Sequence, residues 1–438
     1  MKRFKPKNSI PKLTPGPRKL PLMGNIHQLG SSLAHHTLKK LATKFGPLMH
    51  LQLGEMSTIV VSSLEITREV MKTHDIVFAQ RPYSFASRIL SYDSQNIAFS
   101  PAKRVQSFRA IKEEEVLNLV KSISLKKTSP INLSKKMFSL TYGVTARAAF
   151  GGKTKGQEEF VSIVEEVADM ITIVGMYPSV KLFQVISGIR RTLKKMHKRI
   201  DQILENVLNE HRERKRITES GKGEAEEDLV DVLLRIQKHG DLQFLLTDNN
   251  IKAVILDIFS VGSETSSTIV DWAMSEIAQT EVQSIFDKKG NIDETCLHES
   301  KYLNSVIKET LRLHPSAPLL VPRASSEQCM INGYDIPAKT KVIKFDPERF
   351  LHSEIDFKGR DFEFIPFAAG KRICPGISFA IPNIELPLAH LLYHFDWKLP
   401  DGKKYEELDM EEDLGLIVRR KNDLILIPIP YDQSSFFC

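Results

Sequence analysis

One short loop limits the structures and functions open to this chain more than any other feature. Residues 364–376 read FIPFAAGKRICPG and contain Cys374, directly before an apolar stretch. Gly370 gives the backbone freedom for a tight turn, Pro375 restricts the chain just after the sulfur, and Gly376 lets another group approach closely. These features favour a loop that holds a metal cofactor through its cysteine. The alternative is a buried structural cysteine, which is the commoner role of a lone cysteine.

The composition indicates a globular protein with a substantial core. Of 438 residues, 42% are hydrophobic and 26% are charged, which argues against a disordered chain and against an integral membrane bundle. The net charge of +7 favours contact with an acidic partner or an anionic membrane surface. No apolar run of about 18 residues follows the basic N-terminus, so we expect no membrane anchor in this chain. The four cysteines form no C-x-x-C pair, which favours a reducing compartment.

Turn residues predict three hairpins between short β-like runs. The turns are Gly54-Glu55, Asn332-Gly333 and Lys421-Asn422, the last between Ile417 and Ile427. Asn-Gly gives the strongest signal, because it is a preferred pair of a type I′ turn. Residues 1–24 are basic and rich in proline, so we expect an extended lead-in there and a single domain over residues 25–438.

Apolar residues at three- and four-residue spacing predict three long helices. They cover residues 158–174, 189–216 and 248–279, and a polar loop is expected at 217–228. The second helix carries a cluster of basic residues, namely Arg190, Arg191, Lys194, Lys195, Lys198 and Arg199. Such a run either docks on a membrane or an acidic protein or is a solvated helix face, and the solvated face is the more common case.

The cysteine loop resembles a known signature. Written F-x-x-G-x-R-x-C-x-G, residues 367–376 match the haem-binding motif of the cytochrome P450 family, and further matching phrases extend from residue 11 to residue 430. The chain is most similar to plant microsomal enzymes of the CYP71 clan, especially its CYP71D-like terpenoid oxidases. The resemblance implies a mainly α fold with small β-sheets (α+β), in which haem b lies between the long central helix and the cysteine loop.

The resemblance also implies how haem is held. Cys374 would be the axial ligand of the iron, and a thiolate in that place promotes O–O bond cleavage. Phe367 would shield the sulfur from water, and Arg372 would pair with a haem propionate. The residues implied around haem are Cys374, Arg372, Phe367, Gly370, Gly376, Arg323 and Arg81.

A second motif, VGSETS at residues 261–266, lies within the long apolar helix. Gly262 is expected to loosen that helix locally. The resemblance then assigns proton handling on the oxygen side of haem to Thr265 and Glu264. The alternative is an ordinary polar interruption of a core helix. Val261 departs from the family pattern, which has Ala or Gly there, and its branched side chain would crowd the oxygen side.

A bracing cluster of charged residues is expected near the haem-binding core. Glu309 and Arg312 lie three residues apart on one predicted helix face, where they can pair. The resemblance adds Arg349, from the phrase PERF, to the same cluster. Removing one member of such a buried cluster costs about 3–5 kcal/mol.

Three segments that the family has are missing from this chain. The shortened places are near residues 101/102, 278/280 and 344/345. The first segment would carry a W-x-x-x-R motif that holds a propionate, and the only tryptophans here are Trp272 and Trp397. Pro382 is a further departure, because proline inside a helix costs about 3 kcal/mol.

Two functions follow as alternatives. The first is a haem-thiolate monooxygenase that inserts one oxygen atom from O₂ into an apolar small molecule, a terpenoid or other plant specialised metabolite. Electrons would come from NADPH through cytochrome P450 reductase, at the cytosolic face of the endoplasmic reticulum membrane, which this chain would contact peripherally. The implied pocket residues are Val261, Leu319, Val321 and Leu416. The second is a catalytically impaired P450-like remnant or a splice or gene-model variant. No motif supports a nucleic-acid partner.

Overall fold

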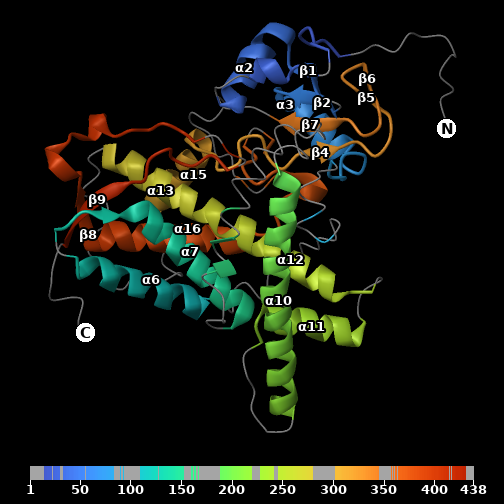
Figure 1. Cartoon of the computed structure of the whole chain (residues 1–438). Helices are drawn as coiled ribbons and strands as arrows, with labels where there is room; N and C mark the ends of the chain where they lie inside the picture. Colours follow the sequence, from blue (N-terminus) through green and yellow to red (C-terminus); the bar gives the residue numbers. More distant parts are fainter. Residues whose placement is uncertain are drawn as a thin grey trace, which may run out of the picture. The chain divides into compact units, whose positions relative to one another are not determined.

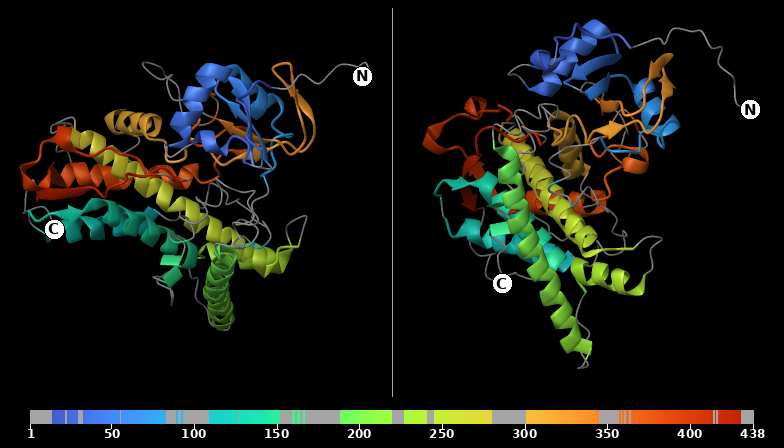
Figure 2. Two further views of the ribbon diagram at one scale, coloured as in Figure 1. Left: turned by 45° about the horizontal axis from the view of Figure 1, so that its top comes forward. Right: turned by 45° about the vertical axis from the view of Figure 1, so that its right-hand side comes forward.

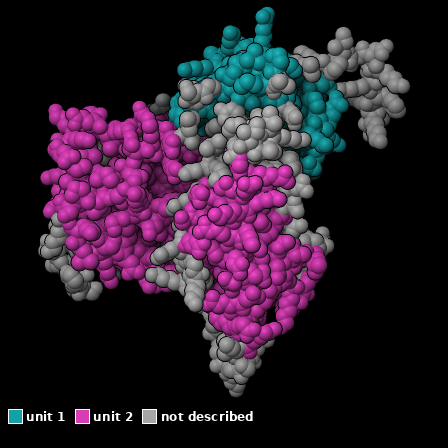
Figure 3. Space-filling view, viewed as in Figure 1, with its two compact units in different colours: residues 1–84, 176–181, 317–374 teal, residues 85–175, 182–316, 375–438 magenta. Residues whose placement is uncertain are grey.

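The structure is a computed structural model, shown in Figure 1 and from two further sides in Figure 2. It describes residues 14–21, 23–29, 33–54, 56–82, 89, 92, 109–126, 128–151, 159–160, 162–163, 166, 188–219, 227–240, 245–279, 301–344, 357, 359, 361–362, 364–413, 415 and 417–430. Contacts between Cα atoms divide the chain into two compact units, which Figure 3 colours separately. Unit 1 comprises residues 1–84, 176–181 and 317–374, and unit 2 comprises residues 85–175, 182–316 and 375–438. The single domain over residues 25–438 stays a prediction.

Unit 1 contains a four-stranded sheet and short helices. The strands are β1 (Leu48–Leu53), β2 (Met56–Val61), β4 (Arg323–Ala324) and β7 (Lys341–Lys344), in the order β1-β2-β7-β4. The helical elements are α1 (Ile26–Leu29), α2 (Ala34–Phe45), α3 (Leu64–Arg68), the π-helical turn η1 (Glu69–Thr73) and the 3-10 turn η3 (Gly370–Arg372). β1 and β2 are antiparallel, so the predicted hairpin around Gly54 is confirmed.

The sheet of unit 1 is buried on both faces. Along β2, Ile59 and Val61 join one buried apolar cluster, whereas Val60 between them joins another. This alternation is the period of two that a strand imposes on its side chains. The sheet therefore forms a rigid support for the segments that follow its strands.

The Asn-Gly hairpin is also confirmed. β5 (Cys329–Ile331) and β6 (Tyr334–Ile336) pair as an antiparallel two-stranded sheet. Asn332 and Gly333 have φ values of 47° and 75°, as both central residues of a type I′ turn require.

Unit 2 is mainly helical. Its helices are α6 (Arg109–Ser124), α7 (Leu133–Phe150), α10 (Ile189–Glu219), α11 (Leu229–His239), α12 (Asp248–Gly262), α13 (Glu264–Gln279), α15 (Lys301–Leu313) and α16 (Ile377–His394). Helices α6, α7, α13 and α16 lie side by side as a bundle (Figure 1). A small sheet, β3 (Ile131–Asn132), β9 (Ile425–Pro430) and β8 (Phe395–Lys398), and the 3-10 turns η4 (Pro400–Gly402) and η5 (Tyr405–Glu407) complete the unit. The predicted mainly α fold with small β-sheets is confirmed.

Two predicted long helices form, and one of them is interrupted. α10 spans the predicted residues and continues to Glu219, three residues into the predicted loop. The predicted helix 248–279 is broken at Ser263, between α12 and α13, directly after Gly262. This bears out the expected loosening at that glycine. Most of the predicted helix 158–174 lies outside the described residues.

The stretch Asp248–Ile277 is long and apolar enough to cross a membrane, but 65% of its apolar window is buried inside the structure. Burial of this extent is what the core helix of a soluble protein shows. The length and composition of this stretch therefore give only weak evidence for a membrane span.

The third predicted hairpin is wrong. β9 pairs with β3 and β8, and the residues before Lys421 do not pair with it. Val418 instead donates its N–H to the carbonyl of Ser316, and its own carbonyl accepts from Trp272. The backbone groups of Val418 are thus used elsewhere, and none of the described residues between 417 and 420 pairs with β9.

Pro382 lies inside α16, as expected from its position. The helix nevertheless runs as one element from Ile377 to His394, with a second interior proline at Pro387. Pro382 is buried, so apolar packing of its ring offsets part of the cost of the missing N–H.

Candidate functional site

The cysteine loop of unit 1 is a series of tight turns. The N–H of Cys374 donates to the carbonyl of Phe367 at 2.8 Å, and the N–H of Ile373 donates to the carbonyl of Gly370 at 3.0 Å. Ala368 and Gly370 have φ values of 62° and 66°. Cys374 is half-buried and forms no disulfide, as a cysteine that ligates a metal requires.

Gly370 is required by space as well as by conformation. A Cβ at this position would lie 2.5 Å from the carbonyl oxygen of Met71 and 2.7 Å from Oδ1 of Asp75. The loop therefore closes directly on the chain that follows η1. The predicted role of Gly370 in a tight turn has a structural basis here.

Asp75 joins this loop to a buried arginine. Its Oδ1 accepts from Nη1 of Arg323 at 3.2 Å, and its Oδ2 accepts from the N–H of Lys371 at 2.7 Å. Arg323 is only 3% exposed and also donates to the carbonyl of Ala369. Sequence reasoning missed Asp75, and no motif marks it, although it lies shortly before the matched phrase FAQRP at residues 78–82.

Two further arginines belong to the same region of unit 1. Nη1 of Arg81 donates to the carbonyls of Val321 and Pro322, at 2.8 Å and 3.2 Å, and Nε of Arg372 donates to the carbonyl of Ala79 at 2.5 Å. Partial desolvation, and then repulsion from Arg372 and Arg323, lowers the pKa of Arg81 to about 10. The three guanidinium groups are therefore close enough to repel one another.

Among the described residues, these three cations have few acidic partners. Within the described part of the chain, Asp75 is the one carboxylate that pairs with Arg81, Arg323 or Arg372. A region with three guanidinium groups and one carboxylate suits an anionic ligand with two carboxylates. A half-buried thiol on an adjacent turn suits a soft or borderline metal. This donor set fits haem, for which Cys374 would supply the iron ligand and the arginines the partners of the propionates.

Other predicted haem residues occupy varied positions. Phe367 is half-buried, and its ring lies 5.6 Å from that of Phe357, edge to face. Gly376 caps the start of α16, where its carbonyl accepts from the N–H of Phe379 and of Ala380. The shielding of the sulfur by Phe367 stays a prediction.

The VGSETS motif surrounds the break between α12 and α13 in unit 2. Oγ1 of Thr265 donates to the carbonyl of Val261 at 2.6 Å, so its single hydroxyl proton is engaged and its lone pairs can accept. Ser263 at the break is buried and hydrogen-bonds Oγ1 of Thr145 at 3.0 Å. Glu264 is 8% exposed, with Oε1 3.9 Å from Nη1 of Arg419. The motif therefore contains an acceptor hydroxyl next to a buried carboxylate.

Glu309 and Arg312 pair as predicted, but the expected burial is wrong for Glu309, whose side chain is 54% exposed, and the bracing role stays a prediction. Arg312 donates to Glu309 from Nε at 2.8 Å and from Nη2 at 2.5 Å, a two-pronged contact across one turn of α15. The hydrogen bond from Arg312 lowers the pKa of Glu309. Arg349 lies outside the described residues, so the third member of the cluster stays a prediction.

The predicted pocket residues differ in their exposure and surroundings. Val261 of unit 2 is 51% exposed and Val321 of unit 1 is 49% exposed, so neither is a core residue of its unit, and their place in a substrate pocket stays a prediction. Leu319 packs against an apolar cluster of unit 1 that includes Leu38. Leu416 lies outside the described residues.

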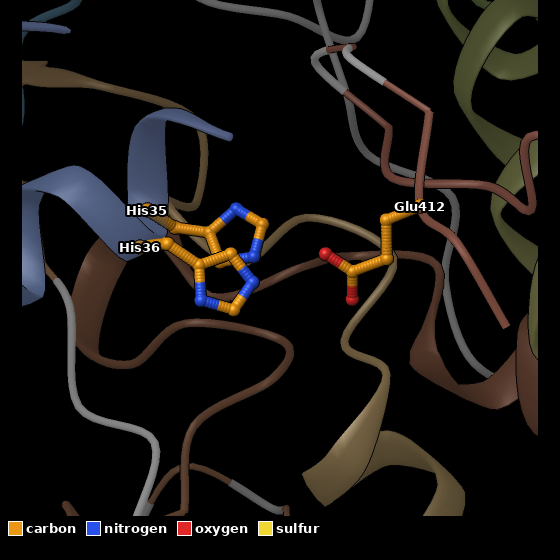
Figure 4. Close-up of side chains that lie close together, drawn as sticks. All are labelled: His35, His36 and Glu412. Atoms are coloured by element: carbon orange, nitrogen blue, oxygen red, sulfur yellow. The ribbon is translucent and has the colours of Figure 1, made fainter. Parts of the chain in front are cut away.

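Figure 4 shows two neighbouring imidazoles on α2, His35 and His36, whose ring centroids are 4.3 Å apart. Glu412, drawn with them, belongs to unit 2, whereas both histidines belong to unit 1. We assign no site to these three residues.

Comparisons with known proteins point to one family. A family model described as Cytochrome P450 matches residues 14–343 and 344–427. "Cytochrome P450 71D10" of Glycine max is 51% identical over 474 aligned positions, covering 96% of this chain and 92% of that protein. "Tabersonine 6,7-epoxidase isoform 1" of Catharanthus roseus is 49% identical, covering 98% and 94%. "Desmethyl-deoxy-podophyllotoxin synthase" of Sinopodophyllum hexandrum is 48% identical, covering 98% and 93%.

A solved structure supports the fold. A zebra fish cytochrome P450 structure with abiraterone aligns with a TM-score of 0.74 at 22% sequence identity. The alignment covers 91% of this chain and 99% of that one.

Proposed function

Because this chain belongs to the cytochrome P450 family of haem monooxygenases, we propose that it inserts one oxygen atom from O₂ into an apolar plant specialised metabolite. Electrons would come from NADPH through cytochrome P450 reductase. Relatives are named as an epoxidase and as hydroxylases, both of which are single-oxygen insertions. The names that specify a substrate refer to tabersonine and a podophyllotoxin precursor, so a terpenoid substrate rests on the sequence resemblance alone.

The observation that carries the proposal is the charge and geometry of the cysteine loop. Cys374 would ligate the iron, and Arg81, Arg323 and Arg372, which repel one another, would bind the propionates. Asp75 would keep Arg323 in place through their ion pair. Gly370 would let the cysteine loop pass close to Met71 and Asp75. Bound haem supplies the thiolate-ligated iron that cleaves the O–O bond.

Proton handling would fall to two residues at the helix break. Thr265 uses its proton toward Val261, so its oxygen is free to accept a hydrogen bond from a neighbouring donor. Glu264 is buried and can hold or release a proton at its carboxyl oxygens. Both residues lie in the first turn of α13, directly after the break at Ser263.

The test is a carbon-monoxide difference spectrum of the reduced, haem-reconstituted chain. We expect the red-shifted band of a thiolate-ligated haem in the unaltered protein and its loss in Cys374→Ala. Cys329→Ala is the matched control, because Cys329 is also half-buried in unit 1 but lies on β5. Absence of the band from folded protein, or its persistence in Cys374→Ala, would refute the assignment.

A second candidate is an impaired or variant P450. The Glycine max alignment has 474 positions, whereas 96% of 438 residues is about 420, so about 54 positions of the relative face no residue here. The family match is also divided between residues 343 and 344, beside the predicted gap at 344/345. Sequencing the transcript across 101/102, 278/280 and 344/345 tests this candidate. If the transcript lacks codons for these segments, the protein is a shortened P450. If the transcript contains them, the second candidate is refuted.

Localisation at the cytosolic face of the endoplasmic reticulum is part of the proposal. The basic face of α10, which includes exposed Lys194, Lys195 and Lys198, would favour anionic lipid. Flotation with phosphatidylserine vesicles tests peripheral contact. Binding that salt reverses is expected, because screening weakens exposed charge interactions. No binding at low salt would count against it.

A further inference from the structure

A segment of unit 2, of which the structure describes residues 409–413, 415 and 417–420, is held at many points and includes an isolated antiparallel bridge between Glu412 and Arg420. The N–H of Val418 donates to the carbonyl of Ser316 at 2.8 Å, and Nε1 of Trp272 donates to the carbonyl of Val418 at 3.3 Å. A Cβ at Gly415 would lie 2.5 Å from the carbonyl oxygen of Ile417, so the turn there is tight. The path of this segment is therefore specified by its anchors.

Arg420 fixes the far end of the segment. It is 6% exposed, donates to Oγ of Ser275 at 2.8 Å and donates to the carbonyl of Asp409 at 2.6 Å. Its guanidinium also lies 5.6 Å from the ring centroid of Trp272. One face of α13 thus receives the end of the segment through polar and ring contacts.

His314 connects the near end of the segment to the same helix. Its ring stacks on Trp272 with centroids 3.9 Å apart and planes 1° from parallel. Nε2 lies 2.6 Å from Oε1 of Glu276 on α13, and Nδ1 lies 3.9 Å from Oε1 of Glu412. The first distance is a hydrogen bond and the second is an ion-pair distance. His314 therefore lies between two carboxylates on different elements, Glu276 on α13 and Glu412 in the segment.

The charge of His314 matters because its surroundings are largely dry. Its side chain is 14% exposed, and that of Glu412 is 16% exposed. Burial lowers the pKa of His314, but the hydrogen bond with Glu276 and the charges of both carboxylates outweigh burial and raise it. A neutral side chain here would leave two acidic groups at one half-buried place without their shared cation.

We propose that His314 is a positioning residue that holds residues 409–420 on α13 and thereby sets the place of Ile417. The resemblance assigns the neighbouring Leu416 to the substrate pocket, so the consequence for substrate choice rests on the proposed function. The attachment of the segment to α13 does not rest on the proposed function. No comparison assigns this role to His314, and the contacts of the three elements supply the argument for it.

The direct test is hydrogen exchange of the full haem-reconstituted chain, read on peptides from 409–421. His314→Phe keeps a ring for stacking on Trp272 but removes the cation, and we expect exchange in these peptides to rise about tenfold. Glu412→Gln, which removes only the segment's own carboxylate, should give a similar rise. In the double variant the two effects should not add, because both remove one interaction.

Glu411→Gln is the matched control. Glu411 neighbours Glu412 and pairs with exposed Lys421, an arrangement that contributes little to stability. We expect exchange of the segment to stay within about twofold of the unaltered chain in this control. Unchanged exchange in both His314→Phe and Glu412→Gln would overturn the proposal, as would fully additive effects in the double variant.

A binding measurement separates this inference from the proposed function. Imidazole and the longer, apolar phenylimidazole are titrated spectrally against haem. We expect His314→Phe to weaken phenylimidazole about fivefold while imidazole changes less than about twofold, because only the longer probe reaches the pocket wall. Equal weakening of both probes would contradict a role in the pocket. If neither probe binds the unaltered chain, the proposed function fails while the exchange result still decides the positioning role.

Discussion

Replacing Asp228 by Asn tests a buried ion pair at the junction of α10 and α11. His211 is 1% exposed, with Nδ1 2.8 Å from the carbonyl of Val207 and Nε2 2.8 Å from Oδ2 of Asp228. Both partners only accept, so both ring nitrogens must donate and His211 is a cation. The group His211, Asp228 and Asp231 has the spacing of a metal site, but an imidazolium has no lone pair for a metal.

The substitution isolates the charge of Asp228. Asp228 is 4% exposed, caps α11 by accepting from the N–H of Asp231 at 2.9 Å and also pairs with Arg214 at 3.0 Å. Asn is as good a helix cap as Asp, so Asp228→Asn keeps the cap and removes the ion pair. Stranding the buried His211 cation should cost about 3–5 kcal/mol. A cost of about 3 kcal/mol raises the local opening equilibrium roughly 140-fold.

The free-energy cost of Asp228→Asn should depend on pH. Burial lowers the pKa of His211, but Asp228 outweighs it and raises the pKa above the ordinary 6.5. Burial raises the pKa of Asp228, but the hydrogen bond and charge of His211 lower it below 3.8. The histidine contribution is complete below 6.5 and is lost as pH rises through its folded pKa. The aspartate contribution is present above 3.8 and is lost as pH falls through its folded pKa.

The assay is hydrogen exchange of peptides from the end of α10 and the start of α11, corrected for intrinsic rates. Asp228→Asn should accelerate exchange by about two orders of magnitude near pH 6, and by less near pH 9, because the contribution of His211 is lost as pH rises through its raised pKa. Glu213→Gln is the control, since its pair with Arg216 on α10 is 63% and 76% exposed. A change of less than about threefold near pH 6, or an equal change at both pH values, would refute the reasoning.

Two shorter predictions follow. Gly370→Ala should cost more than about 1–2 kcal/mol of stability, because a Cβ at this positive φ would also meet the carbonyl of Met71. We expect a lower haem content and a lower thermal midpoint than in the control Gly402→Ala, where φ is 65° and the added Cβ meets open space. Asn383→Leu should stabilise the fold by about 1–3 kcal/mol, as measured by calorimetry, because the 4% exposed amide of Asn383 has no hydrogen-bond partner among the described residues. Destabilisation would show that the amide is hydrogen-bonded after all.

Local chemistry explains what the sequence could predict. Asn332-Gly333 fixes a turn through two adjacent positive φ values, and Gly262 weakens a helix within one turn of itself. Asp75 could not be predicted, because it meets Arg323 only when residues 248 positions apart are brought together by the sheet of unit 1. The hairpin at Lys421 failed for the same reason, since Val418 has tertiary partners for its backbone that no local pattern reveals.

The two sides of the implied haem site have separate structural supports, and this bears on the shortened segments. The cysteine loop is held by Asp75 within unit 1, whereas the helix break at Ser263 is held by Thr145 within unit 2. Neither support comes from residues next to the shortened place at 101/102. Loss of a segment there removes one predicted propionate clamp but leaves both supports intact. Haem binding and substrate turnover therefore test different parts of this chain, and a chain that binds haem at Cys374 can still lack the full rate of a complete enzyme.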